Sequence, residues 1–231
     1  MLCSGTGVIR WVTDTRELNK SYIGVRSDIL DVIPARARKF LDVGCSVGAL
    51  GAELVAVNPE AEVYGIELDP DMARLAMEKL HKVYVANMDD FSLAAEFAPD
   101  TFDCVVLADI LEHLKNPWQV VVEAAEITAA EGFVIACIPN VRHLDTVLNL
   151  VFRGVWPYRN RGIHDRTHLR FFTRKNIVEL FSVEGIEIEA INTNYRLLER
   201  PSRINRWAKY FALPGLKHFL AFQYIIVARK Q

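Results

Sequence analysis

Several features of membrane-spanning, secreted or repetitive proteins are missing from this sequence. No apolar run is long enough to cross a bilayer, and the first ten residues lack the basic start and apolar core of a signal peptide. No internal repeat or low-complexity segment occurs. Cysteine is scarce, and the four cysteines have no metal-type spacing; they are Cys3, Cys45, Cys104 and Cys137. We therefore expect a cytoplasmic protein whose cysteines are small buried hydrophobic residues.

What the chain does contain is enough apolar material for a sizeable core. It has 231 residues, of which 51% are hydrophobic, and this content excludes a disordered protein. We expect residues 1–231 to form a single domain. Within it we distinguish an N-terminal lead-in (1–36), a first half (37–140) and a second half (141–231).

The net charge of -2 conceals an asymmetry between the two parts of the chain. Residues 1–140 carry 11 Lys+Arg against 22 Asp+Glu, a net of -11, whereas residues 141–231 carry 16 against 7, a net of +9. Two interpretations stay open. Either the halves neutralise each other across a shared surface, or the basic half meets an anionic substrate or a membrane surface.

Strand and helix patterns alternate from residue 37 to residue 140. Continuous apolar runs such as 101–108 are typical of strands buried on both faces, and amphipathic stretches separate them. This alternation predicts a parallel sheet with helices on both faces. The first strand, 40–43, runs into a turn punctuated by Gly44 and Gly48 and then into a helix from about 49 to 57. Such a turn lets the backbone approach a ligand closely.

The second strand strengthens this interpretation of the glycine turn. It covers residues 62–66 and ends in Glu67. A carboxylate at that position can accept hydrogen bonds from two ribose hydroxyls. We therefore expect a nucleoside-containing cofactor at the carboxyl ends of these strands.

These motifs resemble those of the class I S-adenosylmethionine-dependent methyltransferases. The resemblance covers roughly residues 38–140 and rests on five segments in the right order, namely Leu41–Gly48, Tyr64–Pro70, Asn87–Asp89, Phe102–Leu114 and Gly132–Pro139. One departure is Ser46, which stands where the family usually has a second glycine. A serine fits there if its φ is negative.

The resemblance implies a Rossmann-like α/β fold with a seven-stranded, mostly parallel sheet. The last strand, 222–228, would be antiparallel and inserted beside the fifth. The implied cofactor is S-adenosyl-L-methionine, with S-adenosyl-L-homocysteine as product. The positions that would contact it are Tyr22, Asp42, Gly44, Cys45, Gly48, Glu67, Leu68, Asn87, Met88 and Ala108. Tyr22 would close over the cofactor or pack on the domain edge, and Met88 would pack on the adenine ring or in the core.

Two later segments, 138–143 and 164–173, narrow the resemblance. They are similar to a bacterial methyltransferase subgroup found in surface-polysaccharide pathways. This implies O-methylation of a sugar or sugar-linked intermediate, with or without phosphate. A looser resemblance to ubiquinone-pathway O-methyltransferases and to MetW-type proteins leaves two alternatives. They are a quinone-like small-molecule acceptor and a cofactor-binding partner protein.

A hydroxyl acceptor needs a group that removes its proton, and histidine suits that task near neutral pH. His143, His164 and His168 all follow the fifth strand, and Asp109 ends the fourth. They are the candidate catalytic residues, although each histidine could instead be structural. No cluster has metal-ligand spacing, so we expect no metal. The chain lacks the Asn/Asp-Pro-Pro-Tyr/Phe motif after the fourth strand, which argues against a nucleic-acid substrate.

The connection from residue 153 to residue 172 is dense in arginine and aromatic residues. A long irregular connection in a compact domain is usually functional. Arginine forks match phosphate oxygens, so we expect an anionic small-molecule or glycan-linked acceptor. The candidate substrate-binding residues are Arg142, Arg159, Arg161 and Arg166. The alternative is that these arginines pair with the acidic first half.

Overall fold

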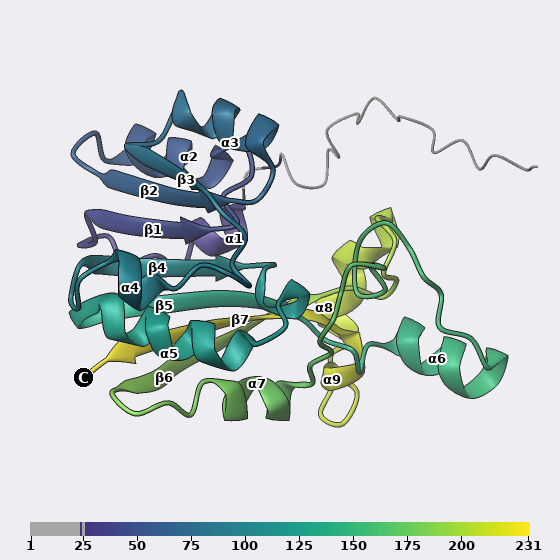
Figure 1. Cartoon of the computed structure of the whole chain (residues 1–231). Coiled ribbons are helices and arrows are strands. Elements are labelled where there is room, and N and C mark those ends of the chain that lie inside the picture. The colour runs from purple at the N-terminus through teal and green to yellow at the C-terminus, as the bar shows by residue number, and fades with distance from the viewer. Residues whose placement is uncertain (1–23, 25) are drawn as a thin grey trace, which may run out of the picture.

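The computed structural model of the chain describes residues 24 and 26–231 and shows one seven-stranded sheet (Figure 1). The strand order is β3-β2-β1-β4-β5-β7-β6. This confirms the expected fold class. Tyr22 and most of the N-terminal lead-in lie outside the described residues.

The strands predicted at 40–43, 62–66, 101–108 and 222–228 all form, with bounds that differ from the prediction by at most two residues. The strands are β1 (Lys39–Val43), β2 (Glu62–Glu67), β3 (Lys82–Val85), β4 (Phe102–Ala108), β5 (Thr128–Pro139), β6 (Ile186–Tyr195) and β7 (Ala221–Lys230). The helices are α1 (Ser27–Leu30), α2 (Ala49–Val57), α3 (Pro70–Met77), α4 (Leu93–Glu96), α5 (Pro117–Ile127), α6 (Leu144–Arg153), α7 (Arg174–Leu180), α8 (Ala208–Phe211) and α9 (Lys217–Leu220). Two 3-10 turns are η2 (Leu111–His113) and η3 (Arg203–Trp207).

The first five strands are parallel, which brings their carboxyl ends to one edge of the sheet. β1 pairs with β2 and with β4, and β4 pairs with β5, all in parallel. β1 and β4 are buried along nearly their whole length, as their continuous apolar runs predict. Residues that follow these strands therefore share one rim, where ligands bind in open α/β sheets.

The last strand breaks the parallel pattern. β7 lies between β5 and β6 and is antiparallel to both. This confirms the position and direction that the family resemblance implied. The antiparallel direction of β7 brings its amino end to the rim where the parallel strands end.

Apolar side chains pack the sheet on both faces. One cluster lies under α5 and α7 and includes Ala124, Ile177 and Leu180. The other lies under α1, α2 and α3 and includes Leu54 and Ala76. This two-sided packing fixes the strands and with them the turns at the rim.

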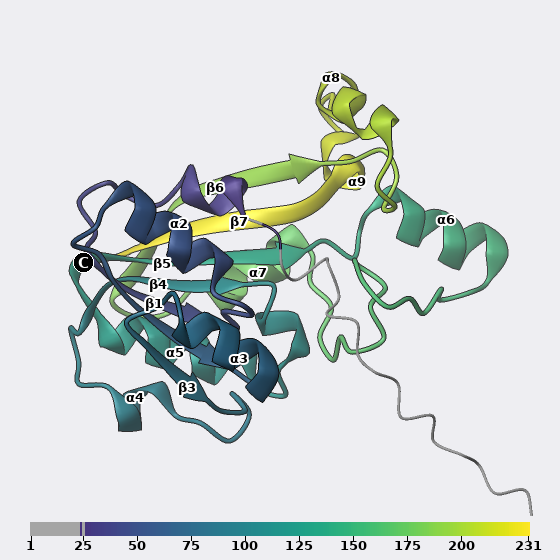
Figure 2. The ribbon, with the colours of Figure 1, turned by 90° about the horizontal axis from the view of Figure 1, so that it is seen from above.

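The second half of the chain adds elements that project beyond the rim. α6 and the α8–α9 segment extend away from the sheet at the end toward which the parallel strands point (Figures 1 and 2). His143 caps α6 by accepting a hydrogen bond from the backbone of Asp145. None of the helices in the described part of the chain has the length and hydropathy needed to cross a membrane. We call residues 37–140 the cofactor half and residues 141–231 the acceptor half, after the roles that the sequence resemblance implies.

Candidate active site

The turn after β1 is shaped by three residues in the left-handed region of backbone space. Gly44, Ser46 and Gly48 have φ values of 79°, 51° and 71°. A Cβ on Gly48 would lie 3.1 Å from the Ala76 Cα, so this glycine allows the turn to pack against α3. A Cβ on Gly44 would lie 3.4 Å from Ile110. The tight turn leaves the first N–H groups of α2 facing the rim.

Ser46 differs from the sequence-based expectation. Its φ is positive, where a negative value was expected, and a left-handed non-glycine residue costs roughly 1–2 kcal/mol. A hydrogen bond opposes that cost, because the Ser46 N–H donates to Glu67 Oε2 at 2.8 Å. The serine hydroxyl also contacts the Met72 sulfur at 3.6 Å. Glu67, at the end of β2, thus stabilises the conformation of the turn after β1.

Glu67 receives hydrogen bonds from two loops. Besides Ser46, the Asp69 N–H donates to its Oε1 at 2.9 Å. A carboxylate has about four lone-pair sites, so both oxygens keep capacity for further donors. The side chain is therefore fixed in place and able to accept bonds from ribose hydroxyls, the role predicted from sequence.

Asp42, at the end of β1, is the most perturbed carboxyl in this part of the site. Its side chain is buried, and burial together with the charge of Glu67 raises its pKa to about 7. The charge of Arg26 opposes this rise. A cationic group arriving at the rim would favour the ionised form of Asp42.

Asp109 lies within a charge cluster at the ends of β4 and β7. Its carboxylate pairs with Arg26 and accepts a hydrogen bond from Gln223 Nε2 at 2.5 Å. Arg26 also pairs with Asp28, which accepts a bond from Asn194 at 2.7 Å. Although burial disfavours its charge, Asp109 and Asp28 raise the pKa of Arg26. Asp109 therefore connects the N-terminal lead-in to the sheet through Arg26. It also occupies the position that was predicted to be catalytic.

The other predicted cofactor contacts occupy the same rim with different exposures. Leu68 is exposed and Asn87 is exposed at its side chain, whereas Met88 and Cys45 are buried and Ala108 is half-buried. Asn87 Oδ1 already accepts from the Asp89 N–H at 3.1 Å, and its amide donates to Asp90 at 2.9 Å.

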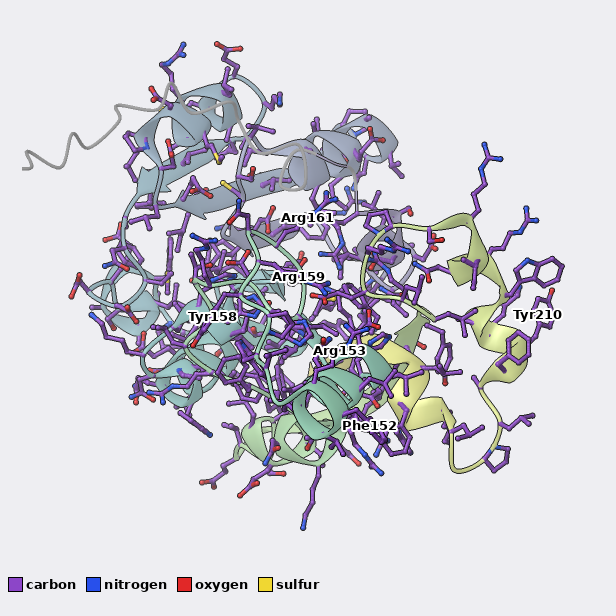
Figure 3. All side chains as sticks on the ribbon, turned by 90° about the vertical axis from the view of Figure 1, so that its right-hand side faces the viewer. Phe152, Arg153, Tyr158, Arg159, Arg161 and Tyr210 are labelled. Atoms are coloured by element: carbon purple, nitrogen blue, oxygen red, sulfur yellow. The ribbon has the colours of Figure 1, made fainter. Side chains whose placement is uncertain are left out.

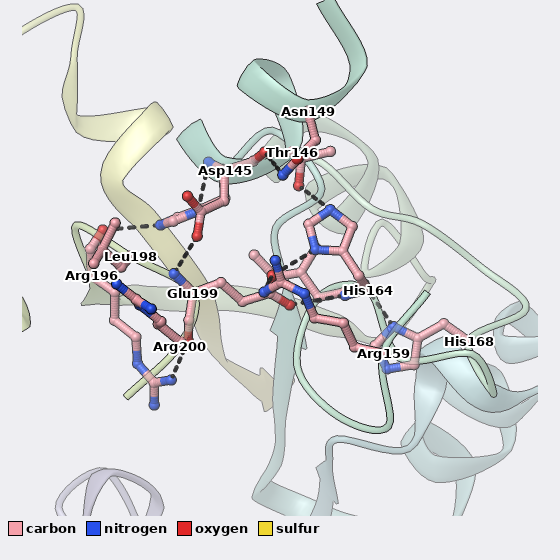
Figure 4. A network of polar contacts seen from close by, with 12 residues as sticks. Asp145, Thr146, Asn149, Arg159, His164, His168, Arg196, Leu198, Glu199 and Arg200 are labelled. Carbon is pink, nitrogen blue, oxygen red and sulfur yellow. Dashed lines mark hydrogen bonds and ion pairs between the residues drawn. The ribbon is translucent and has the colours of Figure 1, made fainter. Parts of the chain in front are cut away.

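His143 and His164 are fully buried and use both ring nitrogens within the protein. The Asp145 N–H donates to His143 Nδ1, so Nε2–H donates to the Arg196 carbonyl at 2.9 Å. In His164, Nδ1 lies 2.6 Å from Glu199 Oε2 and Nε2 lies 3.1 Å from the Thr146 hydroxyl (Figure 4). An ionised carboxylate only accepts, so Nδ1 of His164 donates and Nε2 accepts.

Glu199 is the centre of that network. Arg159 pairs with its carboxylate, the His164 N–H donates to Oε1 at 3.1 Å, and its own N–H donates to Asp145 Oδ2 at 2.6 Å. A Cβ on Gly162 would lie 2.7 Å from Glu199 Oε1, so that glycine makes room for the carboxylate. The network joins α6, the 154–173 connection and the segment after β6 (Figure 4).

Sequence reasoning missed Glu199, although one signal was available. It is the single acidic residue between residues 190 and 231. An isolated acid in a basic segment is a reasonable candidate for a buried ion pair.

His168 lies at the rim and is joined to the Glu199 network through the carbonyl of Ile163, the residue before His164 (Figure 4). Its Nδ1–H donates to the Ile163 carbonyl at 3.1 Å, which leaves Nε2 3.9 Å from Glu112 Oε1. The His113 ring stacks edge-on against it with centroids 4.7 Å apart. Burial and the neighbouring His113 lower the pKa of His168 to about 4. Its Nε2 is therefore unprotonated at neutral pH.

Glu112 completes this second cluster. It is 1% exposed, its Oε2 has no hydrogen-bond partner within the described structure, and burial raises its pKa well above the ordinary value. Ligand atoms of Glu112, His113 and His168 lie within 4.8 Å of one another, so these residues have the donor chemistry for a divalent cation. The spacing of residues along the sequence could not reveal this cluster, because His168 lies far from Glu112 and His113 in the chain. The expectation of a metal-free site stays a prediction.

The 154–173 connection docks directly on the segment after β4. The backbone N–H groups of Leu169 and Arg170 both donate to the Glu112 carbonyl, at 2.8 and 2.9 Å. Arg170 also donates to the Lys115 carbonyl. Of the three candidate histidines, His168 is thus the one that the fold brings against the residues following Asp109.

The four candidate substrate-binding arginines occupy different surroundings. Arg142 stacks on Phe219 with 4.5 Å from its guanidinium to the ring centroid, and Arg159 pairs with Glu199 inside the acceptor half. Arg161 (Figure 3) and Arg166 are exposed. A hollow of about 440 Å³ lined by Val122, Val183 and Lys230 lies at the opposite end of the sheet, so it is not part of this site.

Comparisons with known proteins find relatives of this chain. A family model described as a methyltransferase domain matches residues 41–134. A ubiquinone biosynthesis O-methyltransferase from Photobacterium profundum is 33% identical over 174 residues, covering 69% of this chain and 72% of the relative. One from Thiobacillus denitrificans is 28% identical over 164 residues, covering 68% of each chain.

Solved structures share the fold at low sequence identity. A SAM-dependent methyltransferase from Thermotoga maritima superposes with a TM-score of 0.62 at 15% identity, covering 88% of this chain and 87% of that one. A SAM-dependent methyltransferase from Archaeoglobus fulgidus gives a TM-score of 0.56 at 17% identity, covering 84% and 87%.

Proposed function

Because the chain belongs to the S-adenosylmethionine-dependent methyltransferases, we propose that it methylates a hydroxyl oxygen and that His168 removes the hydroxyl proton. When bound, S-adenosylmethionine supplies an electrophilic methyl group on a sulfonium. The observation that carries the proposal is the unprotonated Nε2 of His168 beside the segment that follows β4. As the oxygen takes the methyl group, its proton would move to that nitrogen.

The acceptor that we favour is a sugar or a sugar-linked intermediate of surface-polysaccharide biosynthesis, used in the cytoplasm. The similarity of segments 138–143 and 164–173 to that subgroup supports this choice. Exposed Arg161 and Arg166, in the connection that also carries His168, suit an acceptor bearing phosphate or another anion.

A phenolic acceptor of the quinone type is the second candidate. It is supported by relatives named as ubiquinone biosynthesis O-methyltransferases. A phenol loses its proton more readily than a sugar hydroxyl, so it depends less on a base. The two candidates therefore differ in how much turnover should depend on His168.

A third candidate belongs to another class, a MetW-type protein that binds the cofactor and acts through a protein partner. The direct test is to incubate the purified protein with S-adenosylmethionine and acceptors of each class. The acceptors would be sugar nucleotides, lipid-linked sugars and catechols, and S-adenosylhomocysteine release would be measured. Cofactor binding without release on any hydroxyl acceptor would contradict the enzymatic proposal and favour the partner protein.

His168→Gln tests the assigned base. Loss of a general base typically lowers kcat by a hundredfold or more, and cofactor affinity should stay unchanged. The acid limb of kcat should lie near pH 4–5 rather than near 6.5, because the pKa of His168 is lowered to about 4. His81→Gln is the matched control, since His81 is exposed and directly precedes β3, at the amino end of that strand.

A chelator distinguishes the base from a metal ligand. If removing divalent cations abolishes turnover and adding them restores it, His168 acts as a ligand and the base assignment is wrong. Turnover that is indifferent to chelator, together with the loss in His168→Gln, supports the base.

A further inference from the structure

Exposed apolar side chains are concentrated on two short segments of the acceptor half. Twenty large hydrophobic residues are exposed in the described structure, and twelve of them fall within residues 148–158 and 204–216. Those on the first segment include Phe152 at 76% and Tyr158 at 71% exposure. Those on the second include Tyr210 at 64% and Leu213 at 58%. Exposed apolar clusters of this kind usually mark an interaction surface.

Both segments project from the same end of the molecule. α6 and the η3–α8–α9 segment extend past the carboxyl ends of the parallel strands (Figures 1 and 2). Viewed onto that end, Phe152 and Arg153 lie at α6 near the middle, Tyr158 lies to their left and Tyr210 lies at the right-hand edge (Figure 3). We call residues 148–158 together with 200–217 the projecting surface.

Positive charge is interleaved with these apolar residues. Residues 200–217 contain no acidic residue and five exposed cations, namely Arg200, Arg203, Arg206, Lys209 and Lys217. Within the described structure none of the five forms an ion pair. Arg206 lies 5.2 Å from the Trp207 ring centroid, and Lys209 lies 5.1 Å from that of Tyr210. Aromatic rings beside unpaired cations suit the interface of an anionic bilayer.

We propose that the projecting surface docks on an anionic lipid bilayer. The aromatic and aliphatic side chains enter the headgroup region, and the cations contact lipid phosphates. A second copy of the chain fits less well, because a two-fold contact would set the same five unpaired cations against each other. A protein partner would need an acidic surface that matches all five cations, because no acidic residue within residues 200–217 offsets them.

The same elements also carry the acceptor side of the site. α6 holds Thr146, which contacts His164, and Asp145, which accepts from the Glu199 N–H. Docking through the tip of α6 would therefore turn the rim toward the membrane. This consequence rests on the proposed function, whereas docking itself does not. An acceptor held at the bilayer would reach the rim directly.

Vesicle co-sedimentation tests the proposal. The full chain should bind vesicles containing one third phosphatidylglycerol and not vesicles of pure phosphatidylcholine, and binding should weaken with added salt. Arg203→Gln/Arg206→Gln/Lys209→Gln should weaken it about hundredfold, because each cation near a charged bilayer contributes about fivefold. The matched control is Arg74→Gln/Lys82→Gln on the cofactor half.

Phe152→Ser/Trp207→Ser/Tyr210→Ser tests the apolar part, with Val57→Ser/Met77→Ser as its control for exposed apolar residues elsewhere. The first variant should lose most vesicle binding and the control should lose none. Unchanged thermal unfolding shows that both fold. Vesicle binding equal in all variants overturns the proposal. So does a dimer in sedimentation velocity that the same changes dissociate without vesicles.

Both sets of changes leave the residues assigned to cofactor and acceptor untouched. Turnover of a detergent-solubilised acceptor should stay unchanged in the variants. Loss of vesicle binding with normal turnover supports the surface independently of the acceptor. Normal vesicle binding without turnover on any acceptor would instead contradict the proposed function.

Discussion

Asp42 in the cofactor half and Glu199 in the acceptor half are both buried carboxyls, yet their pKa values shift in opposite directions. Burial and the charge of Glu67 raise the pKa of Asp42 to about 7. Burial also acts to raise the pKa of Glu199, but hydrogen bonds from His164 and the charge of Arg159 outweigh it and lower that pKa. The two pKa values differ because the fold itself supplies Glu199 with hydrogen-bond donors that stabilise its ionised form against the effect of burial.

This contrast separates two kinds of site. The Glu199 network satisfies its own buried polar groups, and it holds α6 and the 154–173 connection in place. The cofactor half leaves a buried carboxyl whose ionised form is disfavoured until a cation arrives. A protein that must bind a positively charged ligand repeatedly benefits from the second arrangement, because ligand binding then improves its electrostatics.

The largest effect should come from removing the Asp42 charge. A raised pKa means that the folded state holds the proton more tightly, so the free energy of unfolding is highest below about pH 4 and falls as the pH rises to 7. A shift from 3.8 to about 7 corresponds to about 4 kcal/mol. Asp42→Asn should remove this fall in urea unfolding of the cofactor-free protein. The control Asp31→Asn, at an exposed position, should keep the fall in stability with rising pH. Identical pH curves for both variants would show that Asp42 is not the group responsible.

Glu199→Ala should destabilise the acceptor half by about 3 kcal/mol, because it leaves buried His164 and Arg159 without their partner. The sign of its pH dependence is opposite to that of Asp42. The lowered pKa gives stability that is present above about pH 4.5 and is lost as the pH falls through the folded value. Calorimetry should show unchanged cofactor affinity, and exposed Glu184→Ala should change neither quantity. Weakened cofactor binding in Glu199→Ala would show that the two halves are coupled.

Glu67→Ala should weaken cofactor binding tenfold to a hundredfold, since hydrogen bonds to a carboxylate contribute roughly 1.5–3 kcal/mol. Part of this loss would come from the turn, because Ser46 and Asp69 also depend on Glu67. Glu67→Gln keeps one oxygen acceptor and should lose less. Calorimetric affinity equal to that of the unaltered protein in Glu67→Ala would exclude the ribose contact.

The smallest effect concerns the exposed arginines. Arg161→Gln/Arg166→Gln should weaken acceptor binding about fivefold and make it less sensitive to salt, since exposed charges each contribute about 0.5–1 kcal/mol. Arg159 is left in place because it pairs with Glu199. If only thermal stability changes and acceptor KM does not, the acceptor is not anionic at this position.

Much of the sheet and the cofactor rim could be predicted because those signals are local. The apolar run of β4, the glycine turn and the acid that ends β2 each lie within a few consecutive residues. The position of β7 was inferred from the family resemblance, because hydrophobic periodicity does not specify which strands of a sheet become neighbours.

The remaining features depend on residues distant in sequence. Ser46 adopts a left-handed φ because Glu67 accepts its N–H, and a local pattern does not report that bond. His164 meets Glu199, and His168 meets Glu112, only after the connection has folded over the rim. The sequence gives no reason to prefer one of the three histidines, but their surroundings in the structure differ. His143 and His164 use both ring nitrogens in hydrogen bonds within the protein, whereas Nε2 of His168 lies 3.9 Å from Glu112 Oε1.

The place of β7 also dictates an order of assembly during synthesis. Strands β1 to β5 find all their partners among themselves except at the free side of β5, so the cofactor half can fold while translation continues. β6 pairs only with β7, and β7 is made later. Until β7 leaves the ribosome, β5 keeps an open hydrogen-bonding edge and β6 has no partner. A stalled ribosome would therefore display a nearly complete cofactor site beside an unpaired strand, which is the state that chaperones would have to protect.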